Sequence, residues 1–265
     1  MTAGTPVVFV HGLWLHATSW QPWMDLFAEA GYSPVAPGWP GEPETAEEAR
    51  ANPSAVAGHG INDVVDHYAA VIAGLQTKPV VIGHSFGGLI AQRLLAAELA
   101  AAAVAIDAAP IKGVLRLPPS ALRVASIALR NPLNRGKSVA LTGKQFRYGF
   151  GNAVSEAEST EMYEQWNVPS PARPLFEAAA ANFFPNSPAK IDTRNSARGP
   201  LLLIAGGSDR TVPASVTRQT RKLYSKSTAV TDYQEFAGKG HSLALDSGWR
   251  EVADASLTWV NAHLT

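Results

Sequence analysis

The sequence of 265 residues contains no cysteine. Without cysteine the chain forms no disulfides and has no thiol nucleophile, and this composition fits a reducing compartment. No apolar run approaches the length of about 18 residues that a transmembrane helix requires, and residues 1–6 lack the charged and apolar regions of a signal peptide. We therefore expect a cytoplasmic protein with no membrane partner.

An excess of charge of one sign is also missing, because 22 acidic residues balance 22 basic residues and the formal net charge is zero. Nucleic acids and anionic membranes select basic surfaces, so neither is expected as a partner. The sequence contains no glycine-rich phosphate loop, no zinc-ligand spacing and no flavin fingerprint. We therefore expect neither a cofactor nor a metal.

The most informative motif is the segment Gly-His-Ser-Phe-Gly-Gly at residues 83–88, which matches the pattern G-x-S-x-G. It follows the apolar run at residues 79–82 and precedes a helix-like stretch at residues 89–95, so it predicts a strand, a sharp turn and a helix. The glycines on either side of the serine suit a strained turn with no room for a Cβ atom. Such a turn projects the hydroxyl clear of the sheet. Ser85 is therefore the candidate nucleophile.

A serine hydroxyl needs a base to take its proton and a carboxylate to orient that base. His241 lies in a glycine-rich loop after the alternating, strand-like residues 229–236, and an imidazole transfers protons near neutral pH. We interpret it as the general base. Asp209 follows the apolar run at residues 200–205, in a turn that aims its carboxylate at the next loop. It is the candidate acid, and two other acids compete with it: Asp107, which follows the apolar run at residues 103–106, and Asp246.

The order of serine, acid and histidine along the chain is the order found in α/β-hydrolases. The chain resembles this family along nearly its whole length, through residues 7–12, 83–88, 206–209 and 240–241. The resemblance implies the α/β-hydrolase fold. In that family the acid usually follows the strand occupied here by residues 201–205, which favours Asp209 over Asp107.

Acyl transfer also needs two N–H donors that stabilise the oxyanion. The N–H of Phe86 follows the nucleophile and opens a helix, whose dipole adds positive potential at this end. The segment His11-Gly12-Leu13-Trp14 is similar to the His-Gly-x loop of many esterases. The similarity implies that the N–H of Leu13 is the second donor, with Trp14 as the alternative. His11 is expected to be a buried, hydrogen-bonded scaffold residue.

Apolar, strand-like runs alternate with helix-like stretches, which predicts an α/β fold with a mostly parallel sheet flanked by helices. The first strand begins close to the N-terminus, so we expect a reduced sheet of about six strands in a single domain, residues 1–265. Residues 109–197 break this rhythm with prolines and aromatic residues, and we expect them to form a mainly helical cap over a core of residues 1–108 and 198–265. The candidate substrate-binding residues are Trp14, His84, Phe146, Trp166 and Phe183.

A further irregular stretch after the second predicted strand carries an acidic cluster. Its members are Glu42, Glu44, Glu47 and Glu48. We interpret this cluster as part of a solvated surface loop, with substrate gating at the rim of the pocket as the alternative.

These parts predict a serine hydrolase that cleaves a small-molecule carboxylic ester or related acyl substrate through an acyl-enzyme, as a monomer or homodimer. The same triad serves lactonases, amidases, C–C bond hydrolases, acyltransferases and perhydrolases, and the sequence does not separate these activities. A low-turnover ligand receptor and a non-catalytic scaffold are further alternatives. Hydroxynitrile lyases of this fold carry a lysine directly after the catalytic histidine. This chain has Ser242 there, which disfavours lyase activity.

Overall fold

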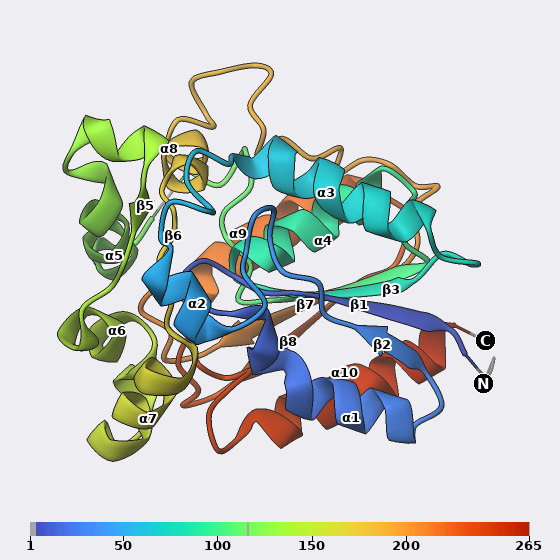
Figure 1. Ribbon diagram of the computed structural model, residues 1–265. Helices are drawn as coiled ribbons and strands as arrows, with labels where there is room; N and C mark the ends of the chain where they lie inside the picture. The colour runs from blue at the N-terminus through green and yellow to red at the C-terminus, as the bar shows by residue number, and fades with distance from the viewer. Residues whose placement is uncertain (1–3, 116, 265) are drawn as a thin grey trace.

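The computed structural model describes residues 4–115 and 117–264, and six of its strands form one sheet (Figure 1). The strands are β1 (Pro6–Val10), β2 (Ser33–Val35), β3 (Val80–His84), β4 (Ala102–Ile106), β7 (Leu201–Gly206) and β8 (Thr231–Phe236). Their order across the sheet is β2-β1-β3-β4-β7-β8, and every neighbouring pair is parallel. This arrangement confirms the prediction of a parallel sheet of about six strands.

The four central strands are buried along their whole length, whereas the edge strands β2 and β8 are partly exposed. Helices on both faces of a parallel sheet exclude water from its central strands, which therefore consist of continuous apolar runs instead of alternating polar and apolar residues. The runs at residues 6–10, 80–82, 102–106 and 201–205 have this character. Their carboxyl ends meet at one edge of the sheet, where the candidate site residues are found.

Helices cover both faces of the sheet, with α3 (Ile61–Ala73) and α4 (Phe86–Ala96) on one face and α1 (Gln21–Glu29) and α10 (Trp249–His263) on the other (Figure 1). The buried residues of α10 are Val252, Ala253, Ser256 and Val260, a spacing that places them on one side of the helix. The remaining elements of this part are α2 (Ala46–Ala51), α9 (Ala214–Leu223), η1 (Ala17–Trp20) and η4 (Tyr224–Lys226).

The chain between β4 and β7 leaves the sheet and forms a group of short elements near the carboxyl ends of the strands (Figure 1). These are α5 (Pro119–Leu129), η2 (Pro132–Gly136), β5 (Ser138–Val139), α6 (Gly143–Gly149), η3 (Gly151–Ala153), α7 (Glu156–Trp166), β6 (Ser170–Pro171) and α8 (Arg173–Ala179). Local capping sets their limits: Thr142 and Gln145 form a capping box at the start of α6, and Ser155 caps α7. No helix in the described ranges has the length and apolar character to cross a membrane.

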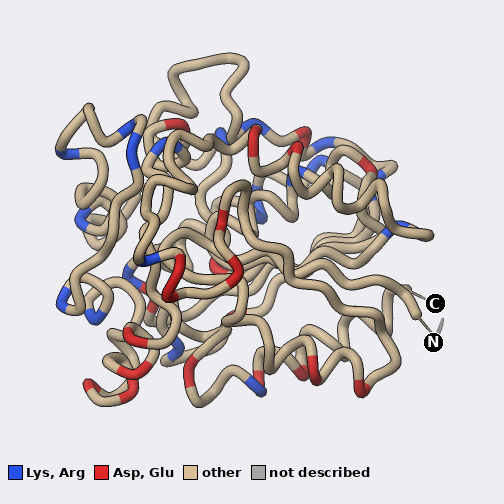
Figure 2. Tube along the Cα trace, viewed as in Figure 1, with Lys and Arg blue, Asp and Glu red and all other residues tan. Residues whose placement is uncertain are grey.

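Charge is distributed unevenly, although the total is balanced. Residues 108–155 include eight basic residues and no acidic residue, whereas α7 carries four glutamates and no basic residue. Figure 2 shows the basic residues gathered around α5 and α6 and the acidic ones on α7 and along the lower helices. Although the net charge of the chain is zero, the segment between β4 and β7 therefore has a positively charged side.

Candidate active site

Ser85 stands in a strained turn between β3 and α4. Its φ angle is 56°, in the left-handed region that residues other than glycine rarely adopt. The turn is fixed by the Ser85 N–H, which donates to Ile106 O at 2.9 Å, and by the N–H of Ala109, which donates to Ser85 O at 2.9 Å. A Cβ atom at Gly83 or at Gly87 would collide with backbone carbonyl oxygens. Both glycines are therefore required by close backbone packing.

His241 and Asp209 form a buried hydrogen-bonded pair. The Nδ1 atom of His241 lies 2.6 Å from Asp209 Oδ2, and both side chains are completely buried. The other Asp209 oxygen accepts hydrogen bonds from Thr211 N at 2.6 Å and Val212 N at 2.9 Å, so the turn after β7 fixes the carboxylate. His241 Nε2 is buried without a hydrogen-bond partner among the described residues. It is the ring nitrogen available to receive a proton.

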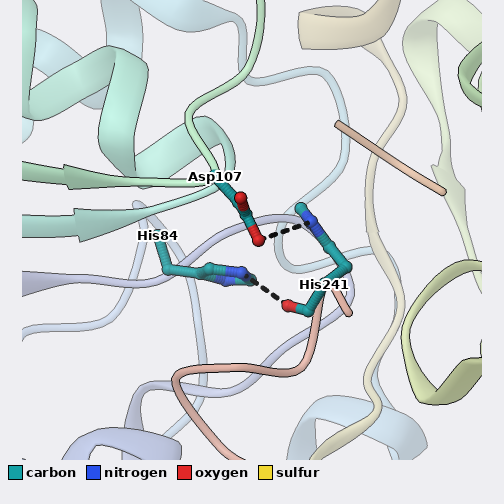
Figure 3. Close-up of side chains that lie close together, drawn as sticks. All are labelled: His84, Asp107 and His241. Atoms are coloured by element: carbon teal, nitrogen blue, oxygen red, sulfur yellow. Dashed lines mark hydrogen bonds and ion pairs between the residues drawn. The ribbon is translucent and has the colours of Figure 1, made fainter. Parts of the chain in front are cut away.

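Asp107 directly follows β4 and also lies against His241 (Figure 3). Its Oδ1 accepts a hydrogen bond from Gly206 N at 2.7 Å, and its Oδ2 lies 3.9 Å from His241 Nδ1. Burial, and then the charge of Asp209, raise the pKa of the Asp107 carboxyl well above its usual range. The longer distance makes Asp107 the second carboxyl of the site and Asp209 the closer partner of the imidazole. The Asp246 carboxylate instead accepts a hydrogen bond from Ser242 Oγ at 2.9 Å.

His84 lies beside His241 and does not line the cavity described below (Figure 3). Its Nε2 donates to the His241 carbonyl oxygen at 2.9 Å, and the two ring centroids are 4.6 Å apart. Burial, and then the proximity of His241, lower the pKa of His84 well below its usual range, so it is neutral. The expectation that His84 binds substrate does not match this placement. His84 is the last residue of β3, and its ring contacts His241 instead of lining the cavity.

His84, Asp107 and His241 also form the one group in the described ranges that resembles a set of metal ligands, with the candidate ligand atoms within 4.8 Å of one another. One nitrogen of each imidazole is already engaged, Nδ1 of His241 by Asp209 and Nε2 of His84 by the His241 carbonyl. A metal bound to Nδ1 of His241 would displace the Asp209 carboxylate. The observed contacts therefore fit a carboxylate–imidazole pair better than a metal centre.

The loop after β1 lies directly against Ser85. A Cβ atom at Gly12 would lie 2.6 Å from Ser85 Cβ and 3.3 Å from Ser85 Oγ. The N–H of Trp14, the alternative oxyanion donor, already donates to Ser170 Oγ at 2.6 Å. The Leu13 N–H has no hydrogen-bond partner among the described residues. This contrast favours Leu13 over Trp14 as the donor on this loop.

His11 holds the same loop from the other side. Its Nδ1 lies 2.9 Å from Gly12 O, and its Nε2 lies 3.2 Å from Glu42 Oε2. Burial lowers the pKa of His11, but the charge and hydrogen bond of Glu42 outweigh this effect, so the pKa is raised above its usual value. A trans peptide directs its C=O and N–H in opposite directions, so fixing Gly12 O toward His11 turns the Leu13 N–H the other way. His11 is a buried, hydrogen-bonded scaffold residue, as expected.

An apolar cavity of about 190 Å³ opens beside Ser85. It is lined from the sheet side by Leu13, Trp14, Ser85, Phe86, Thr211, Val212 and Val216. From the segment between β4 and β7 it is lined by Ala109, Pro110, Leu117, Ala121, Leu122, Val124, Ala125, Leu129, Leu175, Ala178 and Ala179. None of these side chains is charged. The cavity therefore fits an uncharged, apolar group next to the serine hydroxyl.

Three aromatic residues expected at the pocket lie elsewhere, and Phe146, Trp166 and Phe183 do not line the cavity. Phe146 is fully buried and stacks on Phe150 with ring centroids 4.9 Å apart. The carbonyl of Trp166 accepts from His16 N at 3.1 Å, and Phe183 is 83% exposed. Phe146 lies away from the cavity because it packs in the small core between α6 and α7. Trp14, by contrast, lines the cavity.

Two features of the site were missed by sequence reasoning. The α5 residues that line the cavity recur at the i, i+3 and i+4 spacing of one helix face, a signal that the sequence contains. Phe150 packs against the His241 ring with centroids 4.8 Å apart. No local pattern distinguishes Phe150 from the other aromatic residues of the segment.

Comparisons with known proteins agree with this fold. The model of the alpha/beta hydrolase family matches residues 7–255. The chain is similar to a monoacylglycerol lipase from Paleococcus ferrophilus (21% identity, TM-score 0.68, 98% of this chain and 96% of that chain covered). It is also similar to a thermophilic esterase from Thermogutta terrifontis (17% identity, TM-score 0.71, 99% of this chain and 92% of that chain covered). A third similar structure is a putative non-heme bromoperoxidase, BpoC, from Mycobacterium tuberculosis H37Rv (21% identity, TM-score 0.71, 99% of this chain and 94% of that chain covered). No curated protein matches the chain.

At these identities the solved structures are evidence for the fold alone. The family model, however, spans all six strands of the main sheet and the turn that carries Ser85. The chain therefore belongs to the alpha/beta hydrolase family.

Proposed function

We propose that this hydrolase cleaves carboxylic esters through an acyl-enzyme formed on Ser85, with His241 as general base and Asp209 as its orienting acid. The observation that carries the proposal is the buried 2.6 Å hydrogen bond between His241 and Asp209. Ser85 supports it, because it stands in a strained turn directly after His84, which donates to the His241 carbonyl oxygen. The bond to Asp209 fixes the imidazole with Nδ1 as donor and leaves Nε2 to accept a proton.

The reaction follows from these positions. Ser85 Oγ attacks the ester carbonyl carbon while His241 Nε2 takes the hydroxyl proton, and the N–H groups of Leu13 and Phe86 stabilise the oxyanion. Collapse of the tetrahedral intermediate breaks the bond to the alcohol, which leaves with the proton from Nε2. Water then attacks the acyl-enzyme by the same steps, which releases the acid and restores Ser85.

The cavity beside Ser85 supports a particular class of substrate. Its volume of about 190 Å³ is somewhat larger than the cavity of about 150 Å³ that accommodates benzene in an engineered protein core. Its lining is almost entirely apolar. We infer that the acyl group is compact and uncharged, on the order of six carbon atoms, and that residues 109–197 serve as a cap over it. The names of the structural neighbours, an esterase and a lipase, agree with an ester substrate.

The test is hydrolysis of p-nitrophenyl acetate, butyrate, octanoate and dodecanoate by the purified protein, with Ser85→Ala as the control. We expect the short esters to be preferred and turnover to fall by several orders of magnitude in Ser85→Ala. Near wild-type activity in that variant would contradict the proposal. Added alcohols and hydrogen peroxide as competing acyl acceptors distinguish hydrolysis from acyl transfer and perhydrolysis, because only the latter reactions give new esters or peracids.

A further inference from the structure

Two carboxyl groups face the same nitrogen of His241. Asp107 directly follows β4 and Asp209 follows β7, and these strands are neighbours in the sheet. Nδ1 of His241 lies 2.6 Å from Asp209 Oδ2 and 3.9 Å from Asp107 Oδ2, and all three side chains are fully buried. One carboxylate is sufficient to orient the imidazole of a triad. The second carboxyl therefore needs an explanation of its own.

The backbone holds Asp107 firmly in this place. Its φ angle is 42°, in the left-handed region, and its N–H donates to Ile204 O at 2.9 Å. Oδ1 is used by the Gly206 N–H, but Oδ2 has no hydrogen-bond partner among the described residues. Buried polar atoms are normally hydrogen-bonded. The backbone bonds of Asp107 thus account for one of its oxygens, and the other oxygen faces His241 and the Asp209 carboxyl.

The two carboxyl groups do not share the charge equally. The oxygens of Asp209 accept three hydrogen bonds, including that of His241. Burial, followed by the charge of Asp209, raises the pKa of Asp107, which makes Asp107 the neutral member. The other titratable groups around Asp107 are His241, from the loop after β8, and His84, from β3, with His11 beyond His84. His84 is neutral and supplies no charge that would ionise Asp107.

We propose that Asp107 is a reserve positioning residue, neutral while Asp209 is present and able to ionise and orient His241 when Asp209 is removed. The proposal rests on the proposed function, because it takes His241 as the base. Loss of Asp209 removes the opposing charge and opens space beside the imidazole. Asp107 Oδ2 then needs to approach Nδ1 by only about 1 Å to form a hydrogen bond.

The test compares kcat/KM for p-nitrophenyl butyrate across pH in the wild type, Asp107→Asn, Asp209→Ala and the double variant Asp107→Asn/Asp209→Ala. Asparagine keeps the oxygen that accepts from the Gly206 N–H but does not ionise, so it separates charge from packing. Thermal melts followed by circular dichroism establish that each variant is folded. Ser85→Ala gives the background rate. If the wild type hydrolyses the ester no faster than this variant, the proposed function is overturned. The outcomes described next test only the role of Asp107.

We expect Asp107→Asn to lower kcat/KM less than Asp209→Ala does, with the acid limb of the pH profile unmoved. Asp209→Ala is expected to lose about 10- to 100-fold, and the double variant about 10⁴-fold, the loss typical of a triad whose acid is disabled. Equal activity in Asp209→Ala and the double variant would overturn the proposal, as would an acid limb shifted in Asp107→Asn. A loss of about 10⁴-fold in Asp209→Ala alone would also overturn it, and this result does not depend on the folding of the double variant.

Discussion

The Nε2 atom of His11 lies 3.2 Å from Glu42 Oε2, and the two side chains are only 3% and 4% exposed. The pair lies behind the loop that carries Gly12 and Leu13, because the other nitrogen of His11 contacts the Gly12 carbonyl at 2.9 Å. An acidic residue from an irregular loop thus stabilises a cationic imidazole next to the proposed oxyanion hole. Glu42 is therefore not part of a solvated loop, in contrast to the interpretation of its sequence.

Replacing Glu42 by glutamine should destabilise the protein in a pH-dependent way. The unfolded imidazole titrates near pH 6.5 and the folded pKa of His11 is raised, so the pair contributes fully below pH 6.5 and its contribution is lost as the pH rises through the folded pKa. Breaking one partner of a buried pair costs about 3 to 5 kcal/mol. We expect thermal melts to show the largest difference between wild type and Glu42→Gln near pH 6 and a smaller one at alkaline pH.

The exposed Glu44 of the same loop provides the matched control. Glu44→Gln should melt within about 0.5 kcal/mol of the wild type at every pH. A difference between wild type and Glu42→Gln that is constant with pH would contradict the assignment of charge to His11.

Adding one methyl group at Gly12 should block the site. The new Cβ atom would lie 2.6 Å from Ser85 Cβ and 3.0 Å from His84 O, so either the oxyanion loop or the serine must move. Loss of one oxyanion donor typically costs about 100- to 1000-fold in rate, and we expect a loss of at least this size in kcat/KM for Gly12→Ala. Gly136→Ala is the control, because nothing lies within 4 Å of the added atom there. Equal activity of the two variants would show that Gly12 does not border the reacting atoms.

Filling the cavity should shorten the preferred acyl chain. Ala125 on α5 lines the cavity, whereas the adjacent Ser126 is exposed. A phenylalanine at position 125 removes space beside Ser85, so kcat/KM for butyrate and octanoate should fall at least about tenfold further than for acetate. Ser126→Phe should leave the chain-length profile unchanged. If both variants keep the wild-type profile, the acyl group binds elsewhere.

The His84 side chain donates a hydrogen bond to the His241 carbonyl oxygen. We therefore expect stability to be retained only when the replacement side chain places a donor at a similar distance. His84→Gln retains an N–H group near the position of Nε2, whereas His84→Leu leaves the His241 carbonyl unpaired. We expect the leucine variant to lose about 1 to 3 kcal/mol of unfolding free energy and the glutamine variant to lose less. Denaturant unfolding measures both. Greater stability of the leucine variant would contradict this supporting role.

Much of the fold could be predicted from the sequence because its signals are local. Strands buried on both faces consist of continuous apolar runs, and a serine between glycines after such a run identifies the turn at Ser85. Because parallel strands end at one edge of the sheet, the residues after these runs were expected to meet there. Asp209 and His241 do so, and Asp107 joins them.

The segment between β4 and β7 could not be predicted in the same way. The aromatic residues at positions 146, 166 and 183 indicate buried apolar area, but the direction of each side chain depends on how α5 to α8 dock on the core, which is a long-range property. Phe183 is exposed and small residues such as Ala121 and Ala178 line the cavity instead. The position of Glu42 is non-local for the same reason, because its partner His11 lies 31 residues earlier in the sequence.

The most direct test of the account is mass spectrometry of the protein after reaction with a p-nitrophenyl alkylphosphonate, which phosphonylates an activated serine irreversibly. If Ser85 is the nucleophile, we expect one adduct per chain on the peptide that contains Ser85, with stoichiometric release of p-nitrophenol, and no adduct in Ser85→Ala. The adduct should form at least about 100-fold more slowly in His241→Ala, because the general base is absent. An adduct on another residue, or ester hydrolysis that survives complete modification of Ser85, would contradict the assignment of Ser85 as the nucleophile.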